Sequence, residues 1–204
     1  MTDPDTVSTY EAVADQYHRR HADRSGVEAL VEQFLQSVDA TTDGSTSRVL
    51  DVGTGPGWES ATFTEHGHDT VGVDLTPAFL EIAREKATQA AFLRMDMRRL
   101  GLQRNAFDGV WACASLLHVP REDVPATLSE FRRVLRPGGV ALLSVKRGDG
   151  TTTGSGYDGD ARRFTLFQPD EFESMVADAG LDVRSTTPGD PDHWIQLEAE
   201  VPET

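Results

Sequence analysis

Cysteine is almost absent from this sequence, which contains only Cys113. One cysteine cannot form a disulfide within the chain, so the fold must be stabilised by burial and hydrogen bonding. No apolar run approaches the ~20 residues that a helix needs to cross a bilayer. The polar start of the chain also lacks the charged and apolar parts of a signal peptide. These absences predict a soluble, cytoplasmic protein without a membrane partner.

Lysine is scarce too, with only Lys86 and Lys146 in 204 residues. Asp and Glu number 34 against 19 Lys and Arg, which gives a net charge of −15 at pH 7. Such a chain repels a phosphate backbone, so we expect no nucleic-acid partner. The composition suits a protein in concentrated salt, where screening weakens the repulsion between like charges. We therefore hypothesise a halophilic source, with an ordinary acidic cytosolic protein as the alternative.

Motifs of several other chemistries are missing. The sequence has no G-x-x-x-x-G-K-[ST] phosphate loop and no G-x-S-x-G nucleophile elbow. His66 and His68 have no second Cys/His pair near them in the sequence, so we expect no metal site. The length and the lack of internal repeats predict one domain over residues 1–204.

The most informative segment is a short apolar run followed by glycines, Arg48-Val-Leu-Asp-Val-Gly-Thr-Gly-Pro-Gly57. Its first part is typical of a buried parallel strand. Gly53, Gly55 and Gly57 follow at every second position, and a helix is expected to begin near Trp58. A strand, a glycine-rich turn and a helix together predict a nucleotide site, because ligand atoms can approach the glycine backbone and the free N–H groups of the helix.

The spacing of the glycines bears on which nucleotide is bound. Dinucleotide-binding proteins use G-x-G-x-x-G, whereas the third glycine here comes one residue earlier. Asp51 lies two residues before the first glycine, where its charge would repel a pyrophosphate but suit an ammonium or a sulfonium group. Both features disfavour a nicotinamide-dependent oxidoreductase, which is kept as an alternative.

The segment Leu50-Asp-Val-Gly-Thr-Gly-Pro-Gly57 resembles the first motif of class I S-adenosylmethionine (AdoMet)-dependent methyltransferases. Further tracts resemble the same family from about Tyr10 to Ala199, in its order. These tracts are Thr70-Val-Gly-Val-Asp74, Met95-Asp-Met97, Phe107-Asp-Gly-Val110 and Val134-Leu-Arg-Pro-Gly-Gly139. The Asn/Asp-Pro-Pro-Tyr-type tract of the family's nucleic-acid and protein methyltransferases is missing after the fourth strand, which favours a small-molecule acceptor.

The resemblance also implies the architecture. We expect an α/β fold with a Rossmann-like, doubly wound, seven-stranded sheet of order 3-2-1-4-5-7-6, the last strand antiparallel and helices on both faces. The expected strands are residues 49–52, 70–74, 91–94, 107–113, 140–146, 181–185 and 193–199. Residues 1–40 should form an N-terminal helical lid. The glycine-rich segment 147–163 should be a mobile loop at the substrate site.

By resemblance, the cofactor is AdoMet and its product is S-adenosylhomocysteine. Asp74 lies 21 positions beyond Gly53 at the end of a strand, where a carboxylate can accept hydrogen bonds from both ribose hydroxyls. The resemblance assigns Asp96 and Met97 to the adenine, although an Asp after a short strand can also be a plain turn residue. The expected cofactor-binding residues are Tyr10, Tyr17, Asp51, Gly53, Thr54, Gly55, Gly57, Asp74, Leu75, Asp96, Met97, Ala114 and Ser115.

Three residues are open to two interpretations each. Tyr10 and Tyr17, on a helix that precedes the core in the family, either line the cofactor pocket or merely dock that helix on the sheet. His118 follows the fourth strand and is the candidate catalytic residue. It is either a general base or substrate-orienting group, or a histidine that satisfies backbone groups in an apolar loop.

The expected activity is an in-line SN2 transfer of the AdoMet methyl group to a small-molecule acceptor. A non-catalytic, AdoMet-binding regulatory protein is the alternative. The candidate acceptor-binding residues could hold a carboxylate or a phosphate, or could be surface residues that balance nearby acids. These candidates are Arg147, Tyr157, Arg162 and Arg163.

Overall fold

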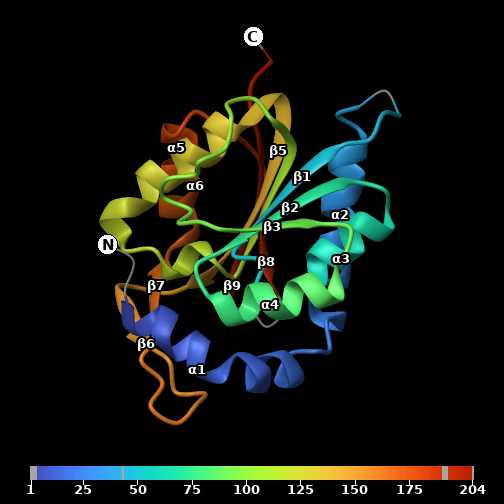
Figure 1. Ribbon diagram of the computed structural model, residues 1–204. Helices are drawn as coiled ribbons and strands as arrows, with labels where there is room; N and C mark the ends of the chain where they lie inside the picture. The colour runs from blue at the N-terminus through green and yellow to red at the C-terminus, as the bar shows by residue number, and fades with distance from the viewer. Residues whose placement is uncertain (1–3, 43, 190–192, 204) are drawn as a thin grey trace.

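The computed structural model describes residues 4–42, 44–189 and 193–203, and within them nine strands form one sheet (Figure 1). The strands are β1 (Arg48–Val52), β2 (Asp69–Asp74), β3 (Ala91–Arg94), β4 (Phe107–Cys113), β5 (Leu135–Arg147), β6 (Thr151–Thr153), β7 (Arg163–Phe167), β8 (Asp182–Gly189) and β9 (Trp194–Glu200). The helices are α1 (Pro4–Arg20), α2 (Glu28–Asp39), α3 (Trp58–Glu65), α4 (Pro77–Lys86), α5 (Val124–Val134) and α6 (Pro169–Asp178). Short 3-10 turns are η1 (Ser25–Val27), η2 (Leu116–His118) and η3 (Arg121–Asp123).

The seven expected strands occur in the expected order. From β3 through β2, β1 and β4 to β5, neighbouring strands are parallel. β9 then pairs antiparallel with β5, and β8 pairs antiparallel with β9. The strand predicted as seventh is β9 and that predicted as sixth is β8. The order 3-2-1-4-5-7-6 with an antiparallel last strand is therefore confirmed.

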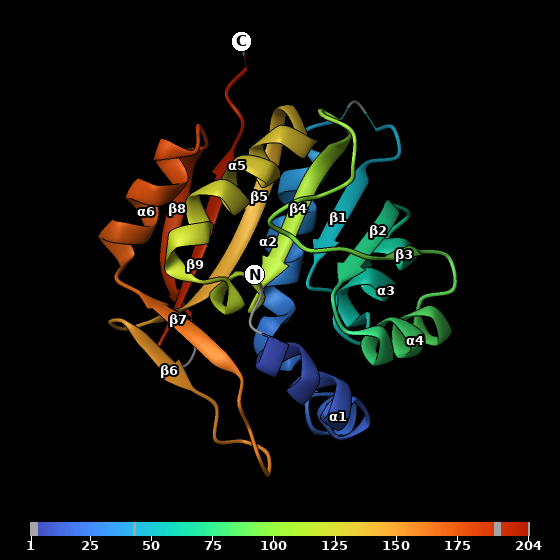
Figure 2. The same cartoon turned by 60° about the vertical axis from the view of Figure 1, so that its left-hand side comes forward.

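The prediction of seven strands lacked two, β6 and β7, which form a hairpin. This hairpin can join the sheet because β4 pairs with only part of the longer strand β5. β4 pairs with β5 as far as Ser144, and beyond it Lys146 and Arg147 pair with β7 in parallel. β6 then pairs antiparallel with β7, so a hairpin extends the sheet at this end (Figure 2). Sequence alone favoured a loop here, since the threonines of β6 lie between glycine-rich stretches and pair with residues 163–165, beyond the second of these stretches.

Helices cover both faces of the sheet, as expected (Figure 1). Alternate strand residues point to opposite faces. Leu50 and Val110 belong to the core cluster that α5 and α6 complete, whereas Val49 and Trp111 pack with Phe34 of α2. Burying both faces explains why the central strands are nearly continuous apolar runs. The packing brings the carboxyl ends of β1, β2, β3 and β4 to one edge.

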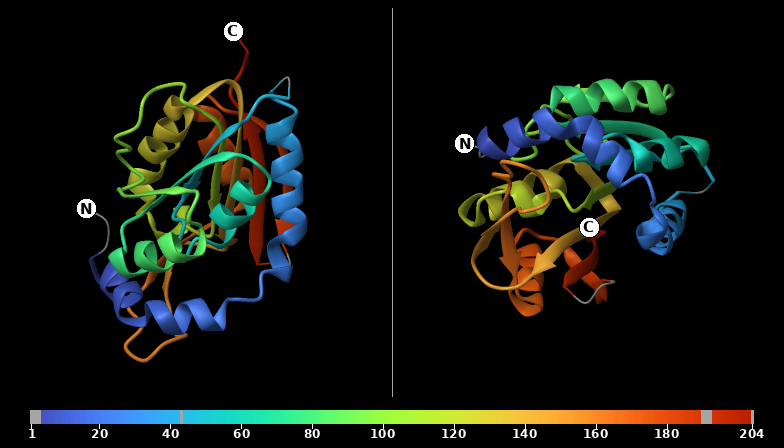
Figure 3. Two further views of the ribbon diagram at one scale, coloured as in Figure 1. Left: turned by 45° about the vertical axis from the view of Figure 1, so that its right-hand side comes forward. Right: turned by 90° about the horizontal axis from the view of Figure 1, so that it is seen from below.

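Helix α1 lies across this edge of the sheet (Figure 3). Its polar face is tied to the β6–β7 connection, since the backbone N–H groups of Arg163 and Ala161 donate to the hydroxyls of Thr6 and Thr9 at 3.0 and 3.3 Å. Glu11 accepts a hydrogen bond from the backbone N–H of Ala78, at the start of α4. Within the described residues, none of the helices has the length and apolar character to cross a membrane.

Candidate functional site

The glycine-rich loop after β1 is fixed by its neighbours. The backbone N–H groups of Gly53 and Thr54 donate to the carbonyl of Val73 at 2.8 and 3.1 Å. Gly53 has φ +71°, and a Cβ at this position would lie 2.3 Å from the Cβ of Ser115. Only glycine allows this backbone conformation and this close approach of the loops after β1 and β4.

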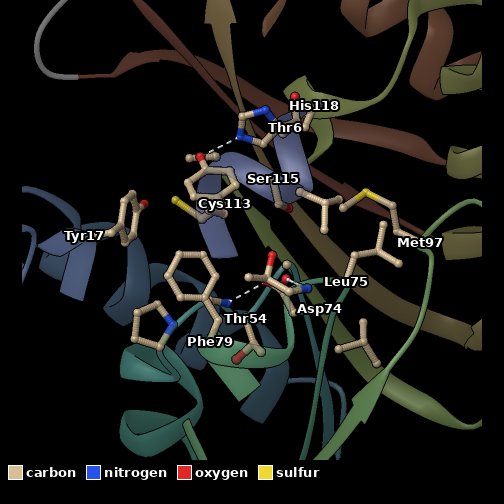
Figure 4. Close-up of a pocket in the computed structure, with 18 of the residues that line it drawn as sticks. Thr6, Tyr17, Thr54, Asp74, Leu75, Phe79, Met97, Cys113, Ser115 and His118 are labelled. Atoms are coloured by element: carbon tan, nitrogen blue, oxygen red, sulfur yellow. Dashed lines mark hydrogen bonds between the residues drawn. The ribbon is translucent and has the colours of Figure 1, made fainter. Parts of the chain in front are cut away.

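A cavity of about 960 Å³, including its open mouth, lies between α1 and the carboxyl ends of the strands (Figure 4). We call it the central cavity. Of the residues assigned to the cofactor from the sequence, it is lined by Tyr10, Tyr17, Gly53, Thr54, Gly55, Asp74, Leu75, Asp96, Met97, Ala114 and Ser115. His118 lines it as well.

Two of the assigned residues, Asp51 and Gly57, lie behind this lining. The Oδ2 atom of Asp51 accepts hydrogen bonds from the hydroxyls of Thr54 and Ser60 at 2.7 and 2.6 Å. Burial, with Glu59 nearby, raises the pKa of Asp51 to about 7. A Cβ on Gly57 would lie 2.8 Å from the Cβ of Ala83 in α4. Both residues shape the loop, and their part in cofactor binding stays a prediction.

Asp74 holds the loop and faces the cavity at the same time (Figure 4). Its Oδ2 accepts a hydrogen bond from the N–H of Gly55 at 3.0 Å, and its Oδ1 accepts one from the N–H of Thr76 at 2.8 Å. Burial raises the pKa of Asp74 above its ordinary value, although these hydrogen bonds favour the carboxylate. The end of β2 thus presents a hydrogen-bond acceptor to the cavity.

Asp96, just after β3, is held by an arginine that the sequence prediction missed. The guanidinium of Arg98 donates from Nη2 to Asp96 Oδ2 at 2.6 Å, and from Nη1 to Asp123 Oδ2 at 2.6 Å. The hydrogen bonds to these two carboxylates raise the pKa of Arg98. Arg98 therefore connects this end of the cavity to η3.

His118 is neutral and its tautomer is defined by its neighbours. Its Nδ1 lies 2.8 Å from the carbonyl oxygen of Arg163, which can only accept, so Nδ1 carries the hydrogen. Nε2 lies 2.9 Å from the hydroxyl of Tyr10 and accepts its hydrogen. Burial lowers the pKa of His118 to about 4 and raises that of Tyr10 to about 12. The lone pair of the imidazole is therefore on Nε2, and the lowered pKa makes this nitrogen a weaker base than that of a free imidazole.

Tyr10 and Tyr17 line the cavity and also dock α1. Their rings lie 5.3 and 5.2 Å from the ring of Phe79 in α4, and 5.4 Å from each other. The two interpretations from the sequence are therefore geometrically compatible. Phe79 itself, which the sequence analysis did not single out, lines the cavity between them.

The candidate acceptor-binding residues lie outside the lining of the central cavity. Arg162 is only 8% exposed, which does not fit a surface arginine. Its Nη2 contacts Asp160 Oδ2 at 2.6 Å, and its guanidinium lies 5.1 and 4.7 Å from the ring centres of Tyr10 and Tyr157. Arg163 contributes its carbonyl to His118, and Arg147 ends β5. Contact of any of them with an acceptor stays a prediction.

Several lining residues were missed because they come from helices or from segments without a motif. Arg24 follows α1 and no pattern marks it. Its Nε donates to Glu59 Oε1 at 2.7 Å, and its guanidinium lies 4.7 Å from the ring centre of Trp58. Trp58 and Glu59 directly follow the last glycine of the loop, and this adjacency was the available signal.

Known proteins resemble this chain in sequence and in structure. The methyltransferase domain family matches residues 49–139. Malonyl-[acyl-carrier protein] O-methyltransferase from Serratia marcescens is 32% identical over 149 residues, which cover 71% of this chain and 56% of that protein. The 18S rRNA (guanine-N(7))-methyltransferase RID2 from Arabidopsis thaliana is 30% identical over 126 residues, which cover 57% and 44%. The chain thus spans about half the length of these curated relatives.

Among solved structures, 1,6-didemethyltoxoflavin-N1-methyltransferase from Burkholderia thailandensis, with bound 1,6-didemethyltoxoflavin and S-adenosylhomocysteine, aligns with a TM-score of 0.79. The alignment covers 98% of this chain and 88% of that one, at 20% identity. This likeness shows that the two chains share a fold.

Proposed function

We propose that this chain is a class I AdoMet-dependent methyltransferase, which the methyltransferase-domain match over residues 49–139 and the Serratia relative support, and that it transfers the AdoMet methyl group to a small-molecule acceptor. The observation that carries the proposal is the central cavity, which joins the glycine-rich loop to Asp74, Asp96 and Met97. A loop that only glycine can form, beside the half-buried carboxylate of Asp74 at the next strand end, fits an adenosine ligand. Bound AdoMet would supply an electrophilic methyl group on a sulfonium.

The residues of the chain bind and orient the reactants. In the proposal, Asp74 accepts hydrogen bonds from the ribose, and Asp96 with Met97 contacts the adenine. The glycine-rich loop, Ala114 and Ser115 face the remainder of the cofactor. Aromatic rings of α1 and α4 keep water from this space. Holding the two reactants in line then supplies most of the rate enhancement, because the methyl group is already activated.

His118 is the proposed general base. Its neutral ring has Nε2 as the acceptor, so it can take the proton that an acceptor hydroxyl, amine or thiol loses on methylation. In the proposal, the Tyr10 hydroxyl is displaced from Nε2 when the acceptor arrives. In the proposal, residues 1–40 serve as the lid, and residues 147–163, which include β6, serve as the mobile substrate segment. The two contact each other through hydrogen bonds to Thr6 and Thr9.

A small-molecule acceptor is favoured over a nucleic acid. The net charge of −15 opposes binding of a phosphate backbone. The name of the Arabidopsis relative indicates that its acceptor is 18S rRNA. The name of the Serratia relative indicates that its acceptor is malonyl-[acyl-carrier protein]. The acidic composition also motivates the proposal that the protein works in the cytoplasm of a halophile.

The proposal is tested by isothermal titration calorimetry in molar salt with S-adenosylhomocysteine, NAD and NADP. We expect micromolar binding of S-adenosylhomocysteine alone, weakened at least about tenfold in Asp74→Ala because a charged hydrogen-bond acceptor is lost. Asp69→Ala, at the exposed start of the same strand, is the matched control and should bind normally. Binding of a nicotinamide nucleotide instead would overturn the proposal. Methylation in an acceptor screen would then exclude a purely regulatory protein.

A further inference from the structure

Lys146 is a half-buried cation at the end of β5. It is one of two lysines in a chain with a net charge of −15. Within the described part of the chain, its ammonium makes no hydrogen bond and no ion pair. Charged groups that are partly withdrawn from water are normally paired, so this one needs an explanation. An anion from outside the chain would supply the missing partner.

Two aromatic rings hold this ammonium in place. Its Nζ lies 4.2 Å from the ring centre of Phe164 and 5.6 Å from that of Trp194. Lys146 and Trp194 are partners in the pairing of β5 with β9, so their side chains project from the same face of the sheet. The faces of the rings attract a cation but accept no conventional hydrogen bond. The N–H groups of Lys146 are therefore positioned and still able to donate to a ligand.

Other cations at this end of the sheet already have partners. The guanidinium of Arg162 donates two hydrogen bonds to the carboxylate of Asp160, at 2.8 and 2.6 Å. Arg147 and Arg163 are not without partners either. An anion that recruited Arg162 would compete with Asp160, whereas Lys146 has no ion pair to lose among the described residues. Lys146 is therefore the cation best prepared to receive an anion.

Lys146 lies beside the end of the central cavity that contains His118. Cys113, which lines the cavity, pairs with Ser144 of β5, and Lys146 follows two residues later on the same face of the strand. The ring of Phe164, which contacts the ammonium, lies 4.9 Å from the ring of His118 (top of Figure 4). One aromatic ring thus contacts both the ammonium and the imidazole. An acceptor whose reacting atom is at Nε2 of His118 can therefore extend its other end to Lys146.

The charge of Lys146 also acts on His118. Burial is the main cause of the lowered pKa of His118, and the charges of Arg162 and Lys146 lower it further. An anion bound to Lys146 would offset part of this effect, because it neutralises one of the two cations. The imidazole would then be a stronger base when the acceptor is present than when it is absent.

We propose that Lys146 binds an anionic group of the methyl acceptor, a carboxylate or a phosphate, while the reacting atom of the acceptor lies near His118. The inference rests on the proposed function for the reaction, and it names the class of acceptor as a small acid rather than a neutral molecule. The compact ammonium of lysine suits either anion, because it acts as a point charge and does not require the bidentate geometry that arginine favours.

The direct test is NMR of the lysine side chains, because the chain has only two of them to resolve. Protein labelled with ¹³C,¹⁵N-lysine is titrated at constant ionic strength with malonate, inorganic phosphate and neutral malonamide, with and without saturating S-adenosylhomocysteine. Malonate, phosphate or both should shift the Lys146 signals saturably, with a Kd of about 1 mM, and the effective anion identifies the group. Malonamide should leave these signals in place. Lys86, exposed on α4, is the internal control and should not respond.

The titration can contradict the inference in two ways. Lys146 signals that respond to neither anion would overturn it. Equal shifts of Lys86 and Lys146 would also overturn it, because they would indicate only a general effect of ions. Failure of S-adenosylhomocysteine to bind would contradict the proposed function, which is a different result.

Variants test the same assignment in turnover. For an acid acceptor found in the screen, Lys146→Gln should raise KM about 10- to 100-fold with kcat changed less than about threefold, because a charge-assisted hydrogen bond is lost in binding. Lys146→Arg should restore most of the loss, and Lys86→Gln should have no effect. The S-adenosylhomocysteine affinity of Lys146→Gln should stay within about twofold of that of the unmodified protein. An unchanged KM would overturn the inference, and so would a lost cofactor affinity, which indicates a structural role.

Discussion

At the scale of single residues, Gly53 and Gly55 differ in one respect that can be measured. Both have positive φ, of +71° and +51°. A Cβ at Gly53 would collide with Ser115, whereas a Cβ at Gly55 would have no atom within 4 Å. We expect Gly55→Ala to lower the free energy of unfolding by about 1–2 kcal/mol, the cost of the left-handed conformation. Gly53→Ala should lose about 3 kcal/mol or more, because overpacking adds to that cost.

Urea unfolding in molar salt measures both glycine variants, and the comparison between them is the informative quantity. The backbone cost is common to the two, so the difference reports the contact between the loops after β1 and β4. Equal losses would mean that Ser115 moves away without cost. That result would contradict the tight approach of these loops.

His118 makes stability depend on pH. Its pKa is about 4 in the folded protein, against about 6.5 in an unfolded chain. Between these values the unfolded chain binds the extra proton, so this contribution to stability is complete above pH 6.5 and is lost as the pH falls towards 4. The free energy of unfolding should drop by about 1–2 kcal/mol more between pH 7 and pH 5 in the unmodified protein than in His118→Gln. Identical pH dependence would show that the buried, neutral state of His118 is wrong.

The sequence predicted those site residues that lie within a local pattern. Gly53 and Asp74 each follow an apolar strand, and parallel strands bring such ends together. Arg24 lies in no pattern, and the packing of the end of α1 against the start of α3 brings it to Glu59. The tautomer of His118 could not be predicted either, because it depends on the carbonyl of Arg163, 45 positions later in the chain.

At the scale of elements, the segment between β6 and β7 is fastened to α1. The carboxylate of Asp160, whose side chain is 1% exposed, pairs with Arg162 and accepts from the backbone N–H of Gly156. The hydrogen bond from Arg162 holds the pKa of Asp160 well below its usual range. The carbonyl of Gly156 in turn accepts from Arg20 of α1. Asp160 is therefore the residue that shapes this segment.

Asp160→Asn should loosen the fastening, since it weakens the charged pair that shapes the turn. Amide hydrogen exchange should become faster, by about tenfold, in residues 154–163 and in α1. Asp158→Asn, two positions away and exposed, is the control and should leave exchange unchanged. Faster exchange in the segment without any change in α1 would mean that the two elements open independently.

The strands that could be predicted are those that the sequence marks as apolar runs in a regular order. A helix lies between successive strands from β1 to β5 except between β3 and β4, and this alternation specifies a parallel sheet. The hairpin β6–β7 was missed because its place in the sheet depends on how far β4 extends along β5. The pairing of β4 with β5 ends at Ser144. Its register is thus a property of the assembled sheet.

At the scale of the whole molecule, charge decides the conditions under which the fold is stable. Helix α6 is an example, since it contains four acidic residues and no basic one. The acidic residues are Asp170, Glu171, Glu173 and Asp178. With a net charge of −15, unscreened repulsion opposes the compact state. We expect the midpoint of thermal unfolding to rise by roughly 5–10 °C between low salt and molar KCl.

A neutralised variant tests the cause of the salt effect. Replacing Asp170, Glu173 and Asp178 by Asn, Gln and Asn should raise the midpoint in low salt and reduce its dependence on KCl. Scanning calorimetry at several salt concentrations measures both effects. A midpoint that does not change with salt in the unmodified protein would exclude adaptation to a saline cytoplasm.

The single thiol of the chain has a practical consequence. Cys113 lines the central cavity, and burial raises its pKa to about 12, so little thiolate is present at neutral pH. If α1 acts as the lid of the proposed function, a thiol-specific reagent should react at a rate set by how often α1 lifts. The rate of thiol modification would then measure how often the proposed lid opens, without any engineered label. It should fall when S-adenosylhomocysteine shields the sulfur.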